Sequence, residues 1–488
     1  MIRNKIPTLY ECSVSDRHGV DLPAPDVPET ALPALELRAD CRLPELSQLD
    51  VVRHYLLLSQ RNFGVDTGFY PLGSCTMKFN PKINEQIACL PGFAESHPLQ
   101  EPDTVQGNLA LMFELQQWLA EIGGFASVSL QPAAGAQGEF TGLLMMRAYH
   151  RERGDLKRMR ILIPDSAHGT NPASTTMAGF IAVELPSDAR GNVDLEAVRV
   201  ACDDTVAGIM ITNPNTLGLF EEHIGEVVRL VHASGGLVYG DGANMNALAG
   251  IARPGDLGFD VMHYNLHKTF STPHGGGGPG SGPVGVSVRL KEFLPGPVVE
   301  YTRDADGARY NLAMPAKSIG RVSTFFGNFG MLVRAYAYIR QHGAEGLREN
   351  SKHAVLNANY LRVKLRDTFA VPFDRTNMHE FVCRGAIDGT GVRALDVSKR
   401  LLDYGFHPPT NYFPLIVPEA LMIEPTETEA KPTLDAFIAA MQAIAKEVLH
   451  DPALVKGAPH ETPVKRLDEV KAARELILSD QVKVANDD

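Results

Sequence analysis

Short apolar runs alternate with helical stretches through the middle of this 488-residue chain, from about residue 107 to residue 288. Such alternation is typical of a mostly parallel sheet that helices cover on both faces, so we predict an α/β fold. The expected strands are residues 126–130, 161–163, 181–184, 207–211, 237–239, 261–264 and 284–288, and the expected helices include 108–122, 139–150, 195–202 and 223–232. In such sheets ligands bind beyond the carboxyl ends of the strands, so the loops there are where chemistry is expected.

The chain is longer than one typical domain, so more than one packed unit is expected. Its first 44 residues are rich in proline, which predicts an extended arm, and a helix is expected over residues 47–62. Beyond Asn328 the pattern changes to two long helices and a short αβ unit that contains the run FVCRGAI. We predict an N-terminal arm with a site motif (1–85), a large domain (86–327), a small C-terminal αβ domain (328–450) and a tail (451–488) with a helix over 467–478.

Charge and composition exclude several classes of function. The net charge is −12 and no basic block is present, which argues against a nucleic-acid partner. No run approaches about 18 apolar residues, so no membrane span is expected. The N-terminus lacks the apolar core of a signal peptide. The cysteines are scattered without metal-ligand spacing, which predicts no metal site and no disulfide framework and fits a reducing cytoplasm: Cys12, Cys41, Cys75, Cys89, Cys202 and Cys383.

One lysine stands out at the end of a predicted strand. Lys268 follows the apolar run that begins at Val261, and the glycines 275–278 come soon after it. Glycine lets a backbone approach a ligand closely. A lysine there is placed to form a Schiff base with a carbonyl compound. An exposed lysine beside a flexible turn is the alternative interpretation, and the partners upstream must decide between them.

Three earlier loops supply those partners. The turn AAGAQGE, residues 133–139, joins a strand to a helix and offers backbone N–H groups to a phosphate. His168 is either a capping or core histidine, or a functional residue that stacks its ring on a planar cofactor or acts as an acid–base group. Asp241 ends a strand, where it is either a helix cap, as Asn244 could be, or an anion for a pyridinium nitrogen. A pyridoxal phosphate site requires a phosphate-binding turn, a stacking ring, a carboxylate and a lysine, and the chain carries candidates for them in this order.

The stretch GFYPLGSCTMKFNPK, residues 68–82, is too interrupted by glycine and proline to form a helix. Composition alone favours an irregular connector with ordinary turn chemistry. Its Cys75 is either a redox-sensitive thiol or a buried inert one.

Taken together, the motifs resemble those of the glycine cleavage system P-protein family, glycine dehydrogenase (decarboxylating), and more narrowly of its subunit 2. The resemblance covers nearly the whole chain and rests on several long runs: YPLGSCTMKFNPK, AAGAQGE, DSAHGTNPAS, TNPNTLGLFE, GDGANMNA, NLHKTFSTPHGGGGPGSGP, FPLIVPEALMIEPTETE and ETPVKRLDEVKAAR.

The resemblance implies a pyridoxal phosphate enzyme of the aspartate-aminotransferase-like fold (fold type I). By motif, Lys268 would form the internal aldimine and Asp241 would bind the ring nitrogen. His168 would stack on the ring and would be a catalytic residue together with Lys268. The phosphate and the remaining ring atoms would be bound by Ala136, Gln137, Gly138, Asn213, Asn244 and His267. Glycine would lie near Tyr70, Ser74, Thr76 and Lys78, which replaces the connector interpretation of that stretch.

The family decarboxylates glycine and transfers the aminomethyl group to the lipoyl group of a small partner, the H-protein, with release of CO2. The resemblance therefore implies lipoylated H-protein and a separate subunit 1, in an α2β2 assembly, as partners, and the glycine tract could line the entrance for the lipoyl arm. Two alternatives remain. One is another fold type I reaction, such as an aminotransferase or a decarboxylase that releases free amine. The other is a non-catalytic subunit that stabilises a partner, against which the intact lysine site argues.

Overall fold

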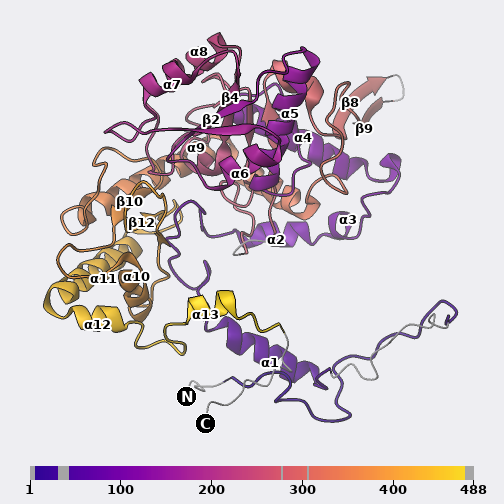
Figure 1. The fold of residues 1–488 in the computed structure, drawn as a ribbon. Coiled ribbons are helices and arrows are strands. Elements are labelled where there is room, and N and C mark those ends of the chain that lie inside the picture. The colour runs from indigo at the N-terminus through magenta and orange to yellow at the C-terminus, as the bar shows by residue number, and fades with distance from the viewer. Residues whose placement is uncertain (1–5, 31–42, 276–278, 305–306, 479–488) are drawn as a thin grey trace. The chain divides into compact units, whose positions relative to one another are not determined.

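The structure is a computed structural model that describes residues 6–30, 43–275, 279–304 and 307–478 (Figure 1). It forms two compact units, residues 1–67 with 461–488 and residues 68–460. All three sheets named below lie in the second unit. The finer domain limits given above stay a prediction. The predicted N-terminal arm is described only in part, and Gly276–Gly278 of the glycine tract lie outside the described residues.

The first unit contains helix α1 (Gln48–Ser59), where a helix is predicted. Its N-cap is Ser47, whose hydroxyl accepts the Asp50 N–H at 3.2 Å while the Asp50 carboxylate accepts the Ser47 N–H at 3.3 Å. These reciprocal bonds form a capping box at the start of the helix. No residue of α1 is buried. The predicted tail helix is shorter than expected, because α13 spans only Glu469–Arg474.

The second unit is built on a seven-stranded sheet, which confirms the predicted mostly parallel architecture. Its strands are β1 (Ser127–Ser129), β2 (Arg160–Pro164), β3 (Ile181–Leu185), β4 (Val206–Thr212), β5 (Leu237–Asp241), β6 (Val261–His263) and β7 (Val284–Val286). Their order is β1-β7-β6-β5-β4-β2-β3, and only β7 runs antiparallel to its two neighbours. The last strand ends earlier than predicted, since Val288 begins the 3-10 helix η3 (Val288–Phe293).

Helices cover both faces of this sheet (Figure 1). They are α4 (Gln106–Gly123), α5 (Gly135–Glu152), α6 (Thr170–Met177), α7 (Leu195–Ala201) and α8 (Ile224–Ala233). Successive strand residues point to opposite faces. Ile161 and Ile163 accordingly pack in one core with Leu143 of α5, whereas Leu162 packs in another core with Leu115 of α4.

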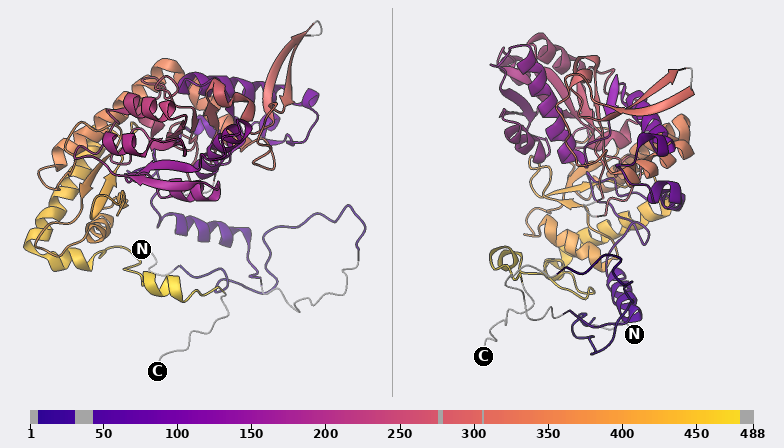
Figure 2. Two further views of the ribbon diagram at one scale, coloured as in Figure 1. Left: turned by 45° about the horizontal axis from the view of Figure 1, so that its top comes forward. Right: turned by 90° about the vertical axis from the view of Figure 1, so that its right-hand side faces the viewer.

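Shorter helices and a hairpin complete the large-sheet region. The helical segments are α2 (Lys82–Ala88), α3 (Pro91–Ala94), η1 (Pro102–Thr104) and η2 (Gly242–Ala247). Strands β8 (Val298–Asp304) and β9 (Gly307–Ala313) pair antiparallel. Figure 2 shows this hairpin projecting from the sheet region. The hairpin and α6 were not expected from the sequence.

The C-terminal part holds the predicted αβ unit. Helix α9 (Phe329–Leu365) joins the two long helices expected there, and its regular geometry breaks at Gly343, whose φ is 62°. Strands β10 (Phe381–Arg384), β11 (Thr410–Asn411) and β12 (Ala420–Ile423) form an antiparallel sheet in the order β10-β12-β11. Helices α10 (Ala394–Asp403), α11 (Lys431–His450) and α12 (Pro452–Gly457) accompany it. Across the described ranges no helix is both long enough and apolar enough to cross a bilayer.

Candidate active site

Lys268 lies in the segment that leaves the carboxyl end of β6, and its side chain is partly buried. Within the described residues its ammonium has no hydrogen-bond or ion-pair partner. Its charge nevertheless lowers the pKa values of Asp241 and of the buried His379, so all three side chains share one electrostatic environment. A partly buried amine without a partner, at a strand end, is available to react with a carbonyl compound.

Asp241 is the last residue of β5, the strand beside β6, and it is buried. Its carboxylate accepts the Ala243 N–H at 2.9 Å and the Asn171 side-chain amide at 3.2 Å, and His263 Nε2 lies 3.4 Å away. Burial alone would raise the pKa of Asp241. The neighbouring His263, the Ala243 N–H and the charge of Lys268 outweigh that effect and lower it, so the carboxylate is held ionised.

A second buried carboxyl group, Glu139 of α5, lies near Asp241. It accepts hydrogen bonds from the hydroxyls of Thr170 at 2.8 Å and Ser174 at 3.1 Å, both from α6. Burial and the charge of Asp241 raise the pKa of Glu139 to about 7. Since the pKa of Glu139 is raised and that of Asp241 is lowered, Glu139 takes up a proton more readily and Asp241 keeps its negative charge.

The predicted phosphate turn is the N-terminus of α5, packed directly against the Lys268 segment. A Cβ on Gly135 would lie 2.5 Å from the Asn265 amide, and one on Gly138 would lie 2.7 Å from the His263 Cβ. Only glycine allows this approach. Gln137 is tied to the turn, since its side-chain oxygen accepts the Ala133 N–H at 2.6 Å, and its amide donates to the Val322 carbonyl. Ala136 lies between these residues on the first turn of the helix.

The other predicted cofactor residues surround the same place. His267 Nδ1 accepts the Ser281 N–H at 3.2 Å, and the neighbouring Gly282 packs on Ala134 at the start of the phosphate turn. Burial, together with the charge of Lys268, lowers the pKa of His267 to about 3, so its ring is neutral. His168 is exposed, its ring 5.5 Å from that of Phe413, and its Nδ1 lies 2.8 Å from the Thr170 hydroxyl.

Several buried polar atoms in this region lack a protein partner among the described residues. They are Asn213 Nδ2, Asn244 Oδ1 and the Ser281 hydroxyl. The two asparagines make their other side-chain bonds within the protein: Asn213 Oδ1 accepts the Glu221 N–H, and Asn244 Nδ2 donates to the Pro214 carbonyl. Ser281 belongs to the segment beside the phosphate turn. Unpaired buried donors and acceptors beside a free lysine, a carboxylate and a glycine-lined turn fit a polar ligand with a phosphate group.

Residues 70–78 come from a different part of the chain and lie against the small sheet. Tyr70 stacks on His407 with ring centroids 3.7 Å apart. The Ser74 N–H donates to Glu380 at 2.7 Å, and the Thr76 N–H donates to Glu424 at 2.8 Å. The charge of Lys268 acts on both glutamates, so this loop borders the lysine site.

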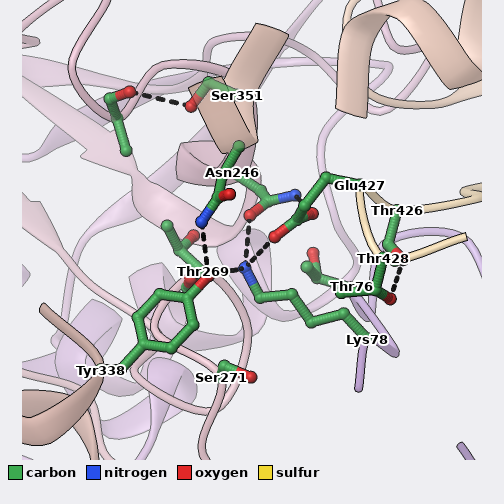
Figure 3. Close-up of polar contacts among 12 residues, drawn as sticks. Thr76, Lys78, Asn246, Thr269, Ser271, Tyr338, Ser351, Thr426, Glu427 and Thr428 are labelled. Carbon is green, nitrogen blue, oxygen red and sulfur yellow. Dashed lines mark hydrogen bonds and ion pairs between the residues drawn. The ribbon is translucent and has the colours of Figure 1, made fainter. Parts of the chain in front are cut away.

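Lys78 has a very different setting from Lys268. Figure 3 shows its ammonium among Asn246, Glu427 and Thr269, at 2.9, 2.7 and 2.7 Å, with the Tyr338 hydroxyl at 3.3 Å. Burial alone would lower the pKa of Lys78, but Glu427 outweighs it and raises that pKa. All its hydrogen-bonding capacity is used inside the protein, so a contact with glycine would require it to exchange a partner.

The structure also bears on the two interpretations of Cys75. The side chain is partly buried, and burial together with the charges of Glu424 and Glu380 raises its pKa to about 11, although Lys268 opposes the shift. Since the thiolate is the reactive form, this environment favours an inert thiol.

Sequence reasoning missed Glu139, Asn171 and His263, the side chains that set the charge of Asp241. Asn171 lies in the quoted run DSAHGTNPAS and Glu139 ends AAGAQGE, so both were within recognised motifs without a role. His263 is the last residue of β6, where strand-end chemistry is expected. It could have been found by the same rule that singled out Asp241.

Comparison with known proteins places the chain among relatives of similar length. The family described as "Glycine dehydrogenase, C-terminal domain" matches residues 350–460. A "Probable glycine dehydrogenase (decarboxylating) subunit 2" of Caldanaerobacter subterraneus subsp. tengcongensis is 58% identical over 485 residues, which cover 98% of this chain and 99% of that one. A protein of the same name from Exiguobacterium sibiricum is also 58% identical, over 481 residues and 97% of each chain.

Solved structures agree in fold. A glycine decarboxylase (P-protein) of the glycine cleavage system, in inhibitor-bound form, superposes with a TM-score of 0.73 at 23% identity, covering 84% of this chain and 92% of that one. A glutamate decarboxylase of Lactobacillus brevis gives 0.63 at 16% identity, covering 90% and 97%. At these identities the likeness concerns the fold, and it confirms the predicted fold type I architecture. With the near full-length identity to the curated relatives, the chain belongs to the glycine dehydrogenase (decarboxylating) subunit 2 family.

Proposed function

We propose that this protein decarboxylates glycine and transfers the remaining aminomethyl group to the lipoyl group of H-protein, with pyridoxal phosphate as cofactor. The observation that carries the proposal is the amine of Lys268, which has no partner in the part of the chain that the structure describes and lies in the electrostatic environment of an ionised Asp241. Family membership supports the same reaction, since the relatives are named glycine dehydrogenases (decarboxylating).

The chain offers a group for each part of that cofactor. Lys268 would hold it covalently through the ε-amine, and Asp241 would pair with its ring nitrogen. The turn at Ala136, Gln137 and Gly138 would bind the phosphate through N–H groups at the start of α5. The unpaired amide nitrogen of Asn213 and the oxygen of Asn244 would bind ring substituents, with His267 near the phosphate and His168 on the ring face.

When bound, the cofactor supplies an electron sink for the pair left on the glycine α-carbon as CO2 departs. The protein's contribution is electrostatic and positional. Glu139 takes up a proton more readily than Asp241, so Asp241 would remain an anion and stabilise a protonated ring nitrogen. Tyr70, Ser74 and Thr76 would border the glycine, and Lys78 would support that border from its buried ion pair with Glu427.

A separate subunit 1 is the partner that the relatives' name, "subunit 2", supports. We infer an α2β2 assembly of the two subunits, a docking site for lipoylated H-protein on that assembly, and a cytoplasmic location. The scattered cysteines support a reducing compartment, and those described, such as Cys75, Cys202 and Cys383, are free thiols.

The test is exchange of labelled bicarbonate into the glycine carboxyl group, catalysed by the chain co-purified with subunit 1. We expect exchange that depends on lipoylated H-protein and is absent with H-protein that lacks the lipoyl group. Transfer of the amino group to a keto acid, or release of free methylamine without H-protein, would instead favour the aminotransferase or simple decarboxylase alternative.

A further inference from the structure

The loop of residues 73–76 is held in an unusual backbone conformation. Ser74 has a φ of 66° and Thr76 a φ of 48°, and both lie in the left-handed region that side-chain-bearing residues avoid. Such a conformation is unfavourable for a residue with a side chain, so the surrounding structure must impose it. Strain of this kind concentrates at ligand sites.

Two strands of the small sheet, β11 and β12, impose this conformation. A Cβ on Gly73 would lie 2.3 Å from the Met422 side chain, so the loop lies directly on β12. The Thr410 hydroxyl of β11 donates to the Gly73 carbonyl at 2.9 Å. Leu72 forms a β-bridge with Ile423, which continues the sheet into the loop.

Two buried glutamates make the remaining bonds, one at each strained residue. Glu380, next to β10, accepts the Ser74 N–H at 2.7 Å and is itself contacted by the Asn244 amide at 3.3 Å. Glu424, next to β12, accepts the Thr76 N–H at 2.8 Å and the Thr76 hydroxyl at 2.6 Å. Both glutamates are 0% exposed, so these bonds do not compete with water.

The two carboxyl groups also lie close together. One carboxylate oxygen of each glutamate and one ring nitrogen of His379 all lie within 4.8 Å of one another. Burial and the mutual charge keep the pKa of Glu380 well above its usual value, and burial raises that of Glu424 to about 7. A shared proton therefore reduces their repulsion, and a neutral hydrogen-bonding group can replace either of them.

We propose that Glu380 and Glu424 are positioning residues, which hold the Gly73–Thr76 loop in its left-handed conformation at the edge of the Lys268 site so that the loop can bind glycine. This inference rests on the proposed function for the identity of the substrate. The holding of the loop itself is independent of the reaction. In this role the glutamates act as hydrogen-bond acceptors and exchange no proton with the substrate.

The test compares Glu380→Ala, Glu424→Ala and the double alanine variant with Glu380→Gln and Glu424→Gln, each in the chain co-purified with subunit 1. Glutamine keeps an oxygen to accept each backbone N–H, and its amide can donate to the Thr76 hydroxyl. Glu429→Ala is the matched control, because Glu429 follows β12 on the same segment and its side chain makes no hydrogen bond within the described part of the chain.

The first readout is amide hydrogen exchange of residues 72–78. We expect the alanine variants to exchange about tenfold faster or more there, while the glutamine variants and the control stay within about threefold of the unsubstituted protein. The second is the KM for glycine, expected to rise about tenfold in the alanine variants with the visible band of the bound cofactor intact, and to be rescued by glutamine.

Three results would overturn the proposal. Unchanged exchange in the double alanine variant would show that the glutamates do not hold the loop. Loss of turnover in the glutamine variants with a protected loop would assign the pair to proton transfer. A stoichiometric metal ion in the unsubstituted protein, lost in the glutamine variants, would make the cluster with His379 a cation site. If the unsubstituted protein lacks glycine exchange but the loop protection follows the pattern above, the proposed function fails and the positioning role stands.

Discussion

Lys78 is buried and Lys268 is partly buried, both at the carboxyl edge of the large sheet. Their ammonium groups nevertheless have opposite surroundings. Lys78 is only 3% exposed and its ammonium has four partners, including the Glu427 carboxylate at 2.7 Å. Lys268 has none within the described residues, although Asp241 and two glutamates lie within range of its charge.

The difference separates a structural lysine from one available for chemistry. A buried ammonium is stable when its desolvation is offset by a close anion and further hydrogen bonds, and such a group is a poor nucleophile. An amine without a hydrogen-bond partner has no protein bond to give up when it bonds covalently to a carbonyl carbon. Substitutions at the two positions should therefore affect different properties.

The largest expected effect is on activity at Lys268. Lys268→Ala should lower glycine–bicarbonate exchange by about 10³-fold or more and abolish the visible band of the bound cofactor. The free energy of unfolding of the cofactor-free protein should change by less than about 0.5 kcal/mol, because the side chain makes no bonds there. Absorbance spectra and urea unfolding measure the two quantities, and a large loss of stability would contradict the comparison.

The next largest effect is on stability at Lys78. Lys78→Met removes the cation and leaves Glu427 buried without compensation, which should lower the free energy of unfolding by about 3–5 kcal/mol. Urea unfolding of the cofactor-free protein measures it. A Lys78→Met protein that is as stable as the parent but cannot bind glycine would instead make Lys78 a substrate ligand with a replaceable internal network.

A double substitution sharpens that result. Lys78→Met with Glu427→Leu removes both charges, so it should recover more than half of the stability that the single substitution loses. Recovery stays incomplete because Asn246, which donates to Glu427 at 3.0 Å, loses a partner. Strictly additive losses in the two single variants and the double variant would mean that the ion pair contributes no coupling.

The smallest effect depends on pH and concerns two buried acids of the Lys268 region, Glu139 beside Asp241 and Glu424. The pKa of Glu139 rises from 4.5 to about 7 on folding, so the stability contributed by its protonated form is complete below 4.5 and is lost as the pH rises to about 7. Glu139→Gln should thus gain up to about 3 kcal/mol over the parent at pH 8 and almost nothing at pH 4.5.

Urea unfolding at the two pH values tests this, with the cofactor-free protein in both cases. Glu424, whose pKa is also raised to about 7, acts in the same direction, so the Glu139→Gln protein should keep part of the parent's pH dependence. An identical pH dependence in parent and variant would mean that Glu139 ionises normally, and the argument that it leaves the charge on Asp241 would fail.

Much of the fold was predictable because the spacing of apolar residues and the position of a residue at a strand end can be recognised within a short stretch of sequence. The strand runs were found to within about two residues, and Asp241 was placed at a strand end, where it lies. Helix α6 was missed because TNPASTTM has no apolar repeat, and it is buried through small polar residues such as Ser174 and Thr175. The β8–β9 hairpin was missed although Val299 of β8 is buried, because the residues of β9 are exposed or only partly buried and of mixed character, which carries little strand signal.

The site was harder to predict where its parts come from distant segments. Glu380 and Glu424 bind Ser74 and Thr76 across more than 300 positions, and nothing in the local pattern of either segment predicts the pairing. The same holds for Lys78, whose anion lies at Glu427. Sequence reasoning proposes which motifs carry chemistry, and that stays a prediction. The choice between a lysine with no partner among the described residues and a neutralised one depends on partners that only folding brings together.

The most direct measurement is to identify the lysine that carries the cofactor. Borohydride reduction of the protein loaded with pyridoxal phosphate fixes the cofactor on whichever amine holds it, and mass spectrometry of the digest locates it. The account predicts a single pyridoxyl group on the peptide that contains Lys268 and none on the peptide that contains Lys78. A modified Lys78, or no fixed cofactor on either peptide, would contradict it.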